Sequence, residues 1–348
     1  MKISQLEATK IINSSGNWAV ECFLKTSQGK ETTASVPQGI STGKQERAPV
    51  EAEEAINQIE KEIFPQITGK ELGQERLDRI LSAGNWGTNA TLAVSAAFFK
   101  LEEVEKTSHL PKMMMLIFEG KSHGNPKLGF QEFMAIVDEI ETGIDFYQTV
   151  KKELVSRGSL ITVGSEGAFS PIDFNDQAIF ELMQKIGVDK IALDTAGNEN
   201  PPTIEALLNL VQRYPIVSIE DPFPEDQPEQ WQEFFQKVVQ INPEILIVAD
   251  DLVVTNTEKI RKGAQDRLFN SVIIKPNQQG TVSAAKNALV TAKELGLKTI
   301  VSHRGEETND NWVADFAIRF KADFVKFGAP ARGERVAKYN RLLQLLKS

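Results

Sequence analysis

The sequence has a single cysteine, Cys22, among its 348 residues. One cysteine excludes an internal disulfide and is typical of a protein that works in a reducing compartment, which predicts a cytoplasmic location. No apolar run approaches the roughly 18 residues that a membrane-spanning helix needs, and the N-terminal stretch MKISQLEATK has no apolar signal-peptide core. We therefore expect neither a membrane protein nor a secreted, disulfide-stabilised one.

Runs and stripes of basic residues are also absent, and the formal net charge is −9. This balance argues against nucleic acid as a partner. An acidic chain is compatible with a bound metal ion, although a solvated acidic surface explains the charge equally well. The length is sufficient for two domains, one of them the size of a β/α barrel.

A repeating pattern of apolar strands with ionisable ends occupies residues 190–326. One helix-like segment separates each strand from the next, and the intervals match the roughly 30 residues that a strand and its crossover helix need. The C-terminal ends of successive parallel strands converge on one mouth of a barrel, where such enzymes place their chemistry. A single charged strand end is usually only solvated, but six in register indicate a site. The six residues are Asp194, Glu220, Asp250, Lys275, His303 and Lys326.

The pattern before this repeat predicts a smaller α+β domain over residues 1–108, followed by a catalytic α/β barrel domain over residues 109–348. Apolar and polar residues first alternate with the period of strands and then recur with the period of helices. The expected elements are strands at 2–12, 19–27 and 31–36, and helices at about 50–64, 74–83 and 88–105.

The loop SVPQGISTGK joins the last of these strands to the first helix. Gly39 and Gly43 flank Ser41, and glycine admits backbone angles that other residues avoid. Two interpretations stay open for this loop. It is either a simple connector or a lid that brings Ser41 over a site.

Two further loops carry polar residues in the first part of the barrel domain. His123 and Gln131 lie in the loop GKSHGNPKLGFQ, directly ahead of Glu132, although a lone loop histidine is often incidental. A helix is expected at 145–157. In ITVGSEGAFSP, Glu166 is expected to follow an apolar strand and to be held in a tight turn between Gly164 and Gly167.

Asp194, Glu220 and Asp250 form an all-oxygen set on three successive strands. Hard oxygen ligands, without cysteine or paired histidines, favour Mg²⁺ over zinc. Mg²⁺ usually takes substrate oxygens as well, so the ion would also bind an anionic substrate. Arg304 suits a phosphate group because its guanidinium is planar and donates two parallel hydrogen bonds.

The remaining charged residues suit proton transfer. A lysine acts as a base only when its charged form is disfavoured, and both Lys326 and a nearby Mg²⁺ are expected to lower the pKa of Lys275. Glu132 and Glu166, if close together, are expected to raise one another's pKa and so to provide an acid. This set predicts proton abstraction next to a carboxylate, followed by loss of a hydroxyl group. The metal is essential because the doubly charged intermediate is otherwise too unstable.

Eight stretches, together far more specific than any single motif, make the chain resemble the enolase (phosphopyruvate hydratase) family over nearly its whole length. The resemblance implies a catalytic barrel of the enolase (β/α)8 type with a smaller N-terminal domain, and a cytoplasmic enzyme of glycolysis and gluconeogenesis. The stretches are GISTG, GTNATLAVS, HGNPKLGFQEFM, YPIVSIED, VADDLVVTNT, IIKPNQQGT, VSHRGEET and KFGAPARGERVAKYN.

The resemblance also implies a role for each site residue. Lys275 would remove the C2 proton of 2-phosphoglycerate, and Glu166 would protonate the departing C3 hydroxyl with Glu132 and His123 beside it. The product would be phosphoenolpyruvate, and two Mg²⁺ ions would take part. The implied ligands of the first ion are Asp194, Glu220 and Asp250, with Ser41 on the second. The implied substrate-binding residues are Ser41, Gln131, His303, Arg304, Gly305 and Lys326.

Several positions depart from the family pattern. Where the family usually reads S-H-R-S-G-E-T, this chain has Gly305 and Glu306 after Arg304, so a hydroxyl is lost and a negative charge is expected near the phosphate. The segment 195–203 is short, and the turn at 13–18 lacks an arginine that serves the family's dimer contact. We expect these changes to affect lid closure, affinity and dimer geometry more than the reaction class, and to leave a homo-oligomer with an altered contact.

Two alternatives to a 2-phosphoglycerate dehydratase follow from these departures. The first is an enolase-like lyase that acts on a related phosphorylated or phosphonylated acid, which the change at Gly305 and Glu306 suggests. The second is a non-catalytic binding protein on the same fold, which the shortened segment and the altered dimer contact suggest. Neither alternative predicts a nucleic acid or a membrane as partner.

Overall fold

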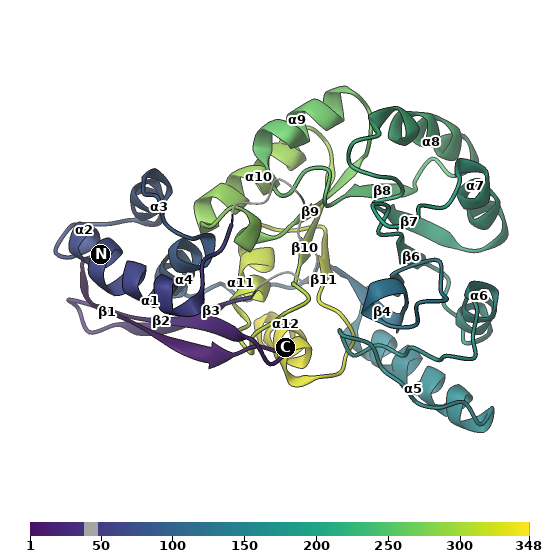
Figure 1. The fold of residues 1–348 in the computed structure, drawn as a ribbon, viewed down its shortest axis with the longest axis horizontal. Helices are drawn as coiled ribbons and strands as arrows, with labels where there is room; N and C mark the ends of the chain where they lie inside the picture. Colours follow the sequence, from purple (N-terminus) through teal and green to yellow (C-terminus); the bar gives the residue numbers. More distant parts are fainter. Residues whose placement is uncertain (38–47, 348) are drawn as a thin grey trace.

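The structure is a computed structural model that describes residues 1–37 and 48–347 (Figure 1). A small N-terminal α+β unit lies beside a closed barrel of eight strands, which confirms the predicted fold class. Figure 1 shows the N-terminal unit on the left, in purple to blue, with the barrel and its helices filling the rest of the view. Ser41 and its loop fall outside the described residues.

An antiparallel three-stranded sheet forms the base of the N-terminal unit. Its strands are β1 (Ile3–Ile12), β2 (Trp18–Thr26) and β3 (Glu31–Val36), joined by short turns. Buried and more exposed residues alternate along β2, because one face of the sheet packs on the core. The helical segments that follow are α1 (Ala52–Asn57), the π-helix η1 (Gln58–Ile63), α2 (Phe64–Ile67), α3 (Gln74–Ala83) and α4 (Thr88–Phe99).

Helix α4 lies between the sheet and the barrel. All twelve of its residues are buried, and the helix contains no charged side chain. It packs on β2 and β3 and also contacts α10 (Val282–Glu294) of the barrel. The helix ends at Phe99, earlier than the predicted end at residue 105, because the charged run that follows no longer suits a buried position.

The barrel closes in the order β10-β11-β4-β5-β6-β7-β8-β9. Neighbouring strands run parallel except at β5, which is antiparallel to both β4 and β6. The strands are β4 (Lys112–Glu119), β5 (Glu132–Val137), β6 (Ile191–Asp194), β7 (Ile216–Glu220), β8 (Leu246–Ala249), β9 (Ser271–Ile274), β10 (Lys298–Ser302) and β11 (Phe324–Lys326).

The reversed direction of β5 determines where its first residue lies. Glu132 begins this strand and pairs with Glu119, the last residue of β4, and with Asp194, the last residue of β6. A parallel β5 would place Glu132 at the opposite end of the barrel. The start of β5 therefore joins the C-terminal ends of the parallel strands at one mouth.

Helices cover the outside of the barrel. Two further expectations from the sequence are wrong: α5 begins at Ile140 rather than at residue 145, and the segment before Glu166 forms no strand, since Val163 makes only an isolated bridge to Phe169. Within the described ranges, no helix is long and apolar enough to cross a bilayer. The helices not yet named are α5 (Ile140–Ser156), α6 (Asp176–Lys185), α7 (Ile204–Arg213), α8 (Pro228–Ile241), α9 (Thr257–Gln265), α11 (Trp312–Arg319) and α12 (Gly333–Leu345).

The N-terminal unit caps a helix of the barrel. Asp78 of α3 accepts a hydrogen bond from the Ser283 N–H at 2.8 Å, and Ser95 of α4 accepts one from the Val282 N–H at 2.9 Å. Ser95 in turn donates to Asp78 at 2.6 Å. Two backbone donors in the first turn of α10 thus find their acceptors on the other domain, and the buried carboxylate lies where the helix dipole favours negative charge.

We expect Asp78→Ala to lower the free energy of unfolding by about 1–3 kcal/mol, because it leaves the Ser283 N–H of α10 and the buried Ser95 hydroxyl without their acceptor. The matched control is Glu75→Ala on the same helix, which removes an exposed ion pair with Lys286 across the same interface. Urea unfolding followed by circular dichroism measures both variants. Equal midpoints for Asp78→Ala and wild type would show that the cap contributes nothing.

Candidate active site at the barrel mouth

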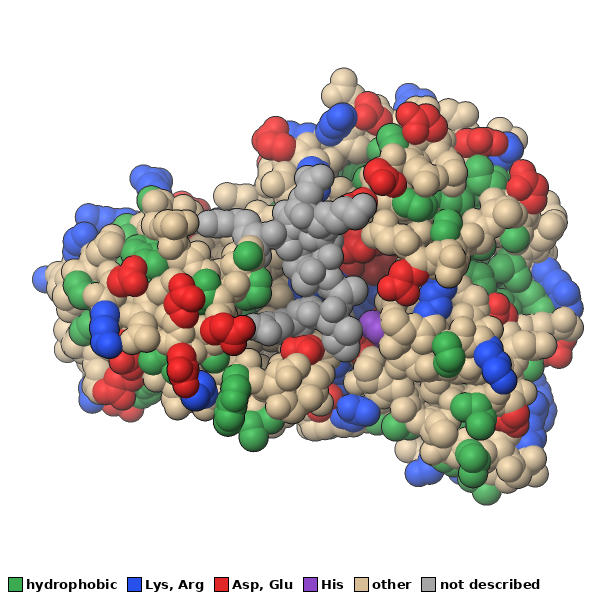
Figure 2. All heavy atoms as spheres, in the orientation of Figure 1, with side chains coloured by type: hydrophobic (Ala, Val, Ile, Leu, Met, Phe, Trp, Pro, Cys, Tyr) green, Lys and Arg blue, Asp and Glu red, His purple; other side chains and the backbone are tan. Residues whose placement is uncertain are grey.

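Ionisable side chains from six strands lie at one end of the barrel. Asp194, Glu220 and Lys326 are the last residues of β6, β7 and β11. The other three directly follow the last residues of β8, β9 and β10, and these are Asp250, Lys275 and His303. Figure 2 shows acidic, basic and histidine side chains close together near the middle of the face in view.

Lys326 lies at the centre of an anionic cluster. Its Nζ is 2.9 Å from Glu132 Oε2, 3.1 Å from Asp194 Oδ2 and 2.8 Å from Glu220 Oε2. Burial acts to lower the pKa of Lys326, but Asp194, Glu132 and Glu220 outweigh it, and the pKa is raised well above its usual range. Lys326 is therefore a permanent cation that holds three strands together at the mouth.

Lys275 forms a close ion pair with Asp250 Oδ2. Burial acts to lower the pKa of Lys275, but Asp250 outweighs burial and the opposing effects of Arg304 and Lys326. The pKa of Lys275 is thus raised, and the expectation that it is lowered is corrected. Lys326 acts to lower the pKa of Lys275, as expected, but Asp250 raises this pKa by more.

The three predicted metal ligands each pair with a lysine. Among the described residues, two other sets place one ligand atom per residue within 4.8 Å of one another, and the predicted trio of Asp194, Glu220 and Asp250 is not one of them. Asp250 belongs to one of the two sets, because its carboxylate lies near the carboxylates of Asp221 and Asp251. The sets are His123, Glu132 and Glu166, and Asp221, Asp250 and Asp251.

The carboxylates at the ends of β6, β7 and β8 nevertheless suit a hard divalent cation. Asp250 Oδ1 is buried and has no hydrogen-bond partner in the described part of the chain. Burial and the neighbouring Asp194 raise the pKa of Glu220 well above its usual range, although Lys326 acts in the opposite direction. Asp250, Glu220 and Asp194 are the residues that would hold such an ion.

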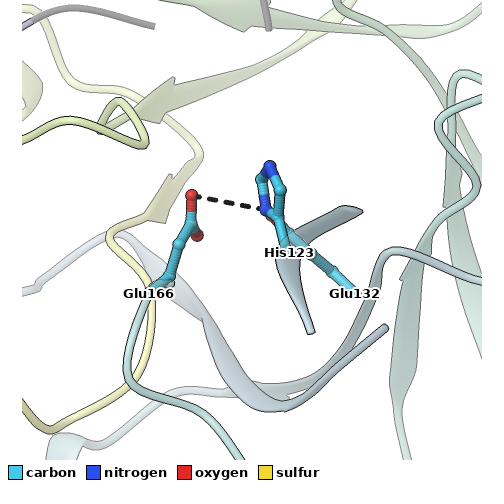
Figure 3. A group of neighbouring side chains, drawn as sticks. All are labelled: His123, Glu132 and Glu166. Atoms are coloured by element: carbon cyan, nitrogen blue, oxygen red, sulfur yellow. Dashed lines mark ion pairs between the residues drawn. The ribbon is translucent and has the colours of Figure 1, made fainter. Parts of the chain in front are cut away.

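Glu132, Glu166 and His123 form a buried group on the other side of the mouth (Figure 3). Glu166 Oε1 is 3.8 Å from His123 Nδ1. Burial raises the pKa of Glu132 to about 8 despite the opposing effect of Lys326. Burial acts likewise on Glu166, but His303 and Arg335 outweigh it, and the pKa of Glu166 is lowered well below its usual range. The expected mutual rise therefore holds for Glu132 and is wrong for Glu166, so the protonated carboxyl group of the pair is Glu132.

His303 and Arg304 follow β10 and are both buried. His303 Nε2 lies 2.9 Å from Glu166 Oε2, and burial lowers the pKa of His303 to about 4, so its ring is neutral. Arg304 Nη1 donates to Asn277 Oδ1 at 3.1 Å, and Asn277 Nδ2 donates to the carbonyl of Pro37 at 3.3 Å. Arg304 is thus connected through one side chain to the last described residue before the Ser41 loop.

The loop between β4 and β5 places Gln131 beside the same mouth. Gln131 is buried, and its Oε1 accepts from the Ser122 hydroxyl at 3.2 Å. Lys121 of this loop donates to the carbonyls of Thr195 at 2.5 Å and Glu199 at 2.6 Å. The short segment after Asp194 is therefore fastened to the β4–β5 loop by one lysine.

Glu306 contacts the turn between β1 and β2. Its Oε2 accepts from Asn13 Nδ2 at 2.9 Å and its Oε1 from Asn17 Nδ2 at 2.9 Å. Ser14 N–H also donates to the carbonyl of Glu307 at 2.8 Å. Two amides of the β1–β2 turn thus bind the carboxylate of Glu306, and the expected effect of its charge on a phosphate group stays a prediction.

Sequence reasoning missed Glu119, the fully buried last residue of β4. Its Oε1 accepts from the Ala168 N–H at 2.7 Å, and its Oε2 accepts from the Glu166 N–H at 3.0 Å. Glu119 therefore fixes the turn that presents Glu166. The signal was present in KMMMLIFE, an apolar strand with a charged end like the six that follow Lys190.

Asp221 is a second residue that the sequence interpretation missed. It accepts hydrogen bonds from the Asp250 N–H at 2.9 Å and the Asp251 N–H at 3.0 Å. Its backbone has a φ of 41°, which a non-glycine residue rarely adopts. Asp221 directly follows Glu220 in the motif PIVSIED and fixes the backbone that carries Asp250.

Comparison with known families gives two matches. A model described as "Enolase, N-terminal domain" matches residues 3–114, and one described as "Enolase, C-terminal TIM barrel domain" matches residues 199–347. The second match includes Glu220, Asp250, Lys275 and Lys326. Residues 115–198 lie outside both matches, and they contain Glu119, His123, Gln131, Glu132, Glu166 and Asp194.

The pH dependence of stability tests the environment of Glu119. Burial raises the pKa of Glu119 to about 8, so the folded protein keeps a proton that the unfolded chain has already lost at neutral pH. The contribution of the protonated Glu119 to the free energy of unfolding is present at low pH and is lost as the pH rises toward about 8. We expect the free energy of unfolding to fall with pH more steeply in wild type than in Glu119→Gln, by up to about 1.4 kcal/mol per pH unit.

Urea unfolding at several pH values between about 5.5 and 8 measures this difference. Glu307→Gln is the matched control: burial acts to raise the pKa of Glu307 as well, but Lys338 and Arg335 outweigh it, and the pKa is lowered. Wild type and Glu307→Gln should therefore share the steep slope. Parallel slopes for wild type and Glu119→Gln would contradict the account.

A double-mutant cycle tests the contact between Glu306 and the β1–β2 turn. Glu306→Ala and Asn17→Ala each remove one partner of the same hydrogen bond, so their effects on the free energy of unfolding should not add. We expect a coupling energy of about 0.5–1 kcal/mol from urea unfolding of the two single variants and the double variant. Additive effects would mean that the two side chains do not interact in solution.

Proposed function

The chain belongs to the enolase superfamily, and from this premise we propose that it is a Mg²⁺-dependent hydro-lyase that converts 2-phosphoglycerate to phosphoenolpyruvate, a step of glycolysis. The observation that carries this proposal is the position of a base and an acid on opposite walls. Glu132 begins β5 and Lys275 follows β9, and these two strands are four positions apart around the ring of eight. A substrate bound between Glu132 and Lys275 would have the acid on one face and the base on the other.

Lys275 is the base in this proposal. It takes the C2 proton in its neutral form, which Arg304 and Lys326 favour and Asp250 opposes. Its side chain is 16% exposed, so it is accessible from the mouth. Asp194, Glu220 and Asp250 would hold a divalent cation, which would supply positive charge to offset the negative charge that proton loss adds to the substrate.

The carboxyl pair Glu132 and Glu166 provides the acid. The pair holds one proton between Glu132 and Glu166, and this proton is available to the departing C3 hydroxyl group. His123 lies beside the pair, and neither of its ring nitrogens has a hydrogen-bond partner among the described residues. These nitrogens are available to orient the hydroxyl group.

The remaining residues orient the substrate. Arg304 binds the phosphate group through its planar guanidinium, and the backbone of Gly305 lies beside it. Lys326 offers its permanent positive charge to the substrate carboxylate, and Gln131 donates from the β4–β5 loop. His303 lines the pocket next to Glu166. We retain Ser41 as a further substrate and Mg²⁺ contact because the family resemblance implies it.

The direct test measures formation of phosphoenolpyruvate from 2-phosphoglycerate by ultraviolet absorbance. Wild type should be active with Mg²⁺ and inactive after chelation, and Lys275→Ala should lower kcat by about 10²–10⁴-fold because the base is lost. Lys298→Ala, at the opposite end of the barrel at the start of β10, is the control that should retain activity. The proposal is wrong if wild type with Mg²⁺ forms no product.

The same assay separates the alternative functions. A lyase for a related phosphorylated or phosphonylated acid would prefer such an analogue to 2-phosphoglycerate. Asn13 and Asn17 bind Glu306, the residue whose charge suggested this alternative, to the β1–β2 turn. A non-catalytic binding protein would turn over neither compound, with or without Mg²⁺.

A further inference from the structure

Arg335 of α12 reaches the barrel mouth from behind the site. Its side chain is fully buried. Nη1 lies 2.8 Å from His303 Nδ1 and donates to the carbonyl of Arg304 at 2.6 Å, and Nη2 donates to the carbonyl of Gly305 at 2.6 Å. One guanidinium group therefore contacts three successive residues of the loop that follows β10.

The contact with His303 defines where the imidazole carries its proton. A guanidinium group donates hydrogen bonds and has no acceptor, so His303 Nδ1 must be the unprotonated nitrogen of the ring. The proton of the neutral ring then lies on Nε2, which is 2.9 Å from Glu166 Oε2. The chemistry of Arg335 alone selects this tautomer.

Close packing keeps the ring in this orientation. Gly328 adopts a φ of +78°, and a Cβ atom at this position would lie 2.8 Å from His303 Cε1 and 3.2 Å from Arg335 Cδ. The backbone can approach both side chains only because the residue is glycine. His303 thus lies between Gly328 and Arg335 with little room to rotate.

We propose that Arg335 is a positioning residue that fixes His303 in its Nε2–H tautomer and thereby directs the Nε2–H group at Glu166 Oε2. With the other tautomer, Nε2 would turn a lone pair toward Glu166, and the two would be compatible only if Glu166 took up a proton. Arg335 therefore aims a hydrogen-bond donor of His303 at Glu166, one of the two carboxyl groups of the acid pair. The effect on catalysis rests on the proposed function, whereas the tautomer does not.

Lys338 provides a matched comparison within the same helix. It is three residues from Arg335 and is also buried. It donates to the carbonyls of Thr308 at 3.2 Å and Asp310 at 2.9 Å, and pairs with Glu307 at 2.8 Å. Lys338 thus holds the next part of the same loop, residues 307–310, rather than His303.

Nitrogen-15 NMR of the imidazole rings tests the proposal. The chain has only 3 histidines, so His109→Gln leaves two to assign. In this background, His303 should show an unprotonated Nδ1 and a protonated Nε2 at neutral pH. Arg335→Gln should give a mixture of tautomers because glutamine both donates and accepts, whereas Arg335→Lys, which only donates, should retain the Nε2–H form.

Lys338→Gln should also retain the Nε2–H form, since it changes an equally buried cation without altering the His303 contact. Protonated Nδ1 in the parent protein, or a pure Nε2–H form in Arg335→Gln, would overturn the proposal. If Arg335→Gln does not fold, the tautomer of His303 in the parent protein still tests the proposal.

Activity gives an independent readout. Arg335→Gln should lower kcat by about 10- to 100-fold, as loss of a hydrogen-bond partner behind a site typically does, with a smaller change in KM. Arg335→Lys should recover most of this loss, and Lys338→Gln should stay near wild type. An inactive parent protein with the expected tautomers would refute the proposed function and leave the assignment of Arg335 intact. A normal kcat in Arg335→Gln would contradict the catalytic part of the inference.

Discussion

The ion pairs between Lys326 and three buried carboxylates are the constraint on which the barrel mouth depends. Glu132, Asp194 and Glu220 come from three adjoining strands, and the buried ammonium group of Lys326 would be costly without these partners. One ammonium group cannot neutralise three carboxylates. Burial is the largest cause of the raised pKa values of Glu132 and Glu220, and neighbouring carboxylates add to it. The mouth is therefore suitable both for a divalent cation and for a carboxyl group that keeps its proton.

The reversed strand β5 places the carboxyl side of the site opposite the lysine side. It places Glu132 at the same mouth as the ends of the parallel strands, across the ring from Lys275. The two walls are supported differently. Asp221 fixes the backbone around Asp250 beside the lysine, while Glu119 and Arg335 fix Glu166 and His303 on the acid side. The site is thus held by backbone contacts and buried polar groups behind the residues that would touch a substrate.

The strand ends could be predicted from the sequence because strand length, crossover spacing and the position of a charged residue are local properties. The direction of β5 could not, since the loop from Gly120 to Gln131 suits either a hairpin or a crossover. The orientation of Glu306 depends on Asn13, which is 293 positions away in the chain. The direction of the pKa shift of Lys275 depends on whether Asp250 or Lys326 is closer, and only coordinates contain that information.

Deuterium exchange at C2 of 2-phosphoglycerate tests the central claim most directly, because it reports proton removal by the barrel mouth separately from loss of the hydroxyl group. The substrate is incubated with the protein and Mg²⁺ in heavy water, and the remaining 2-phosphoglycerate is analysed by proton NMR or mass spectrometry. The account predicts that deuterium appears at C2 with wild type and fails to appear with Lys275→Ala. Equal exchange with both proteins, or no exchange and no product with either, would contradict it.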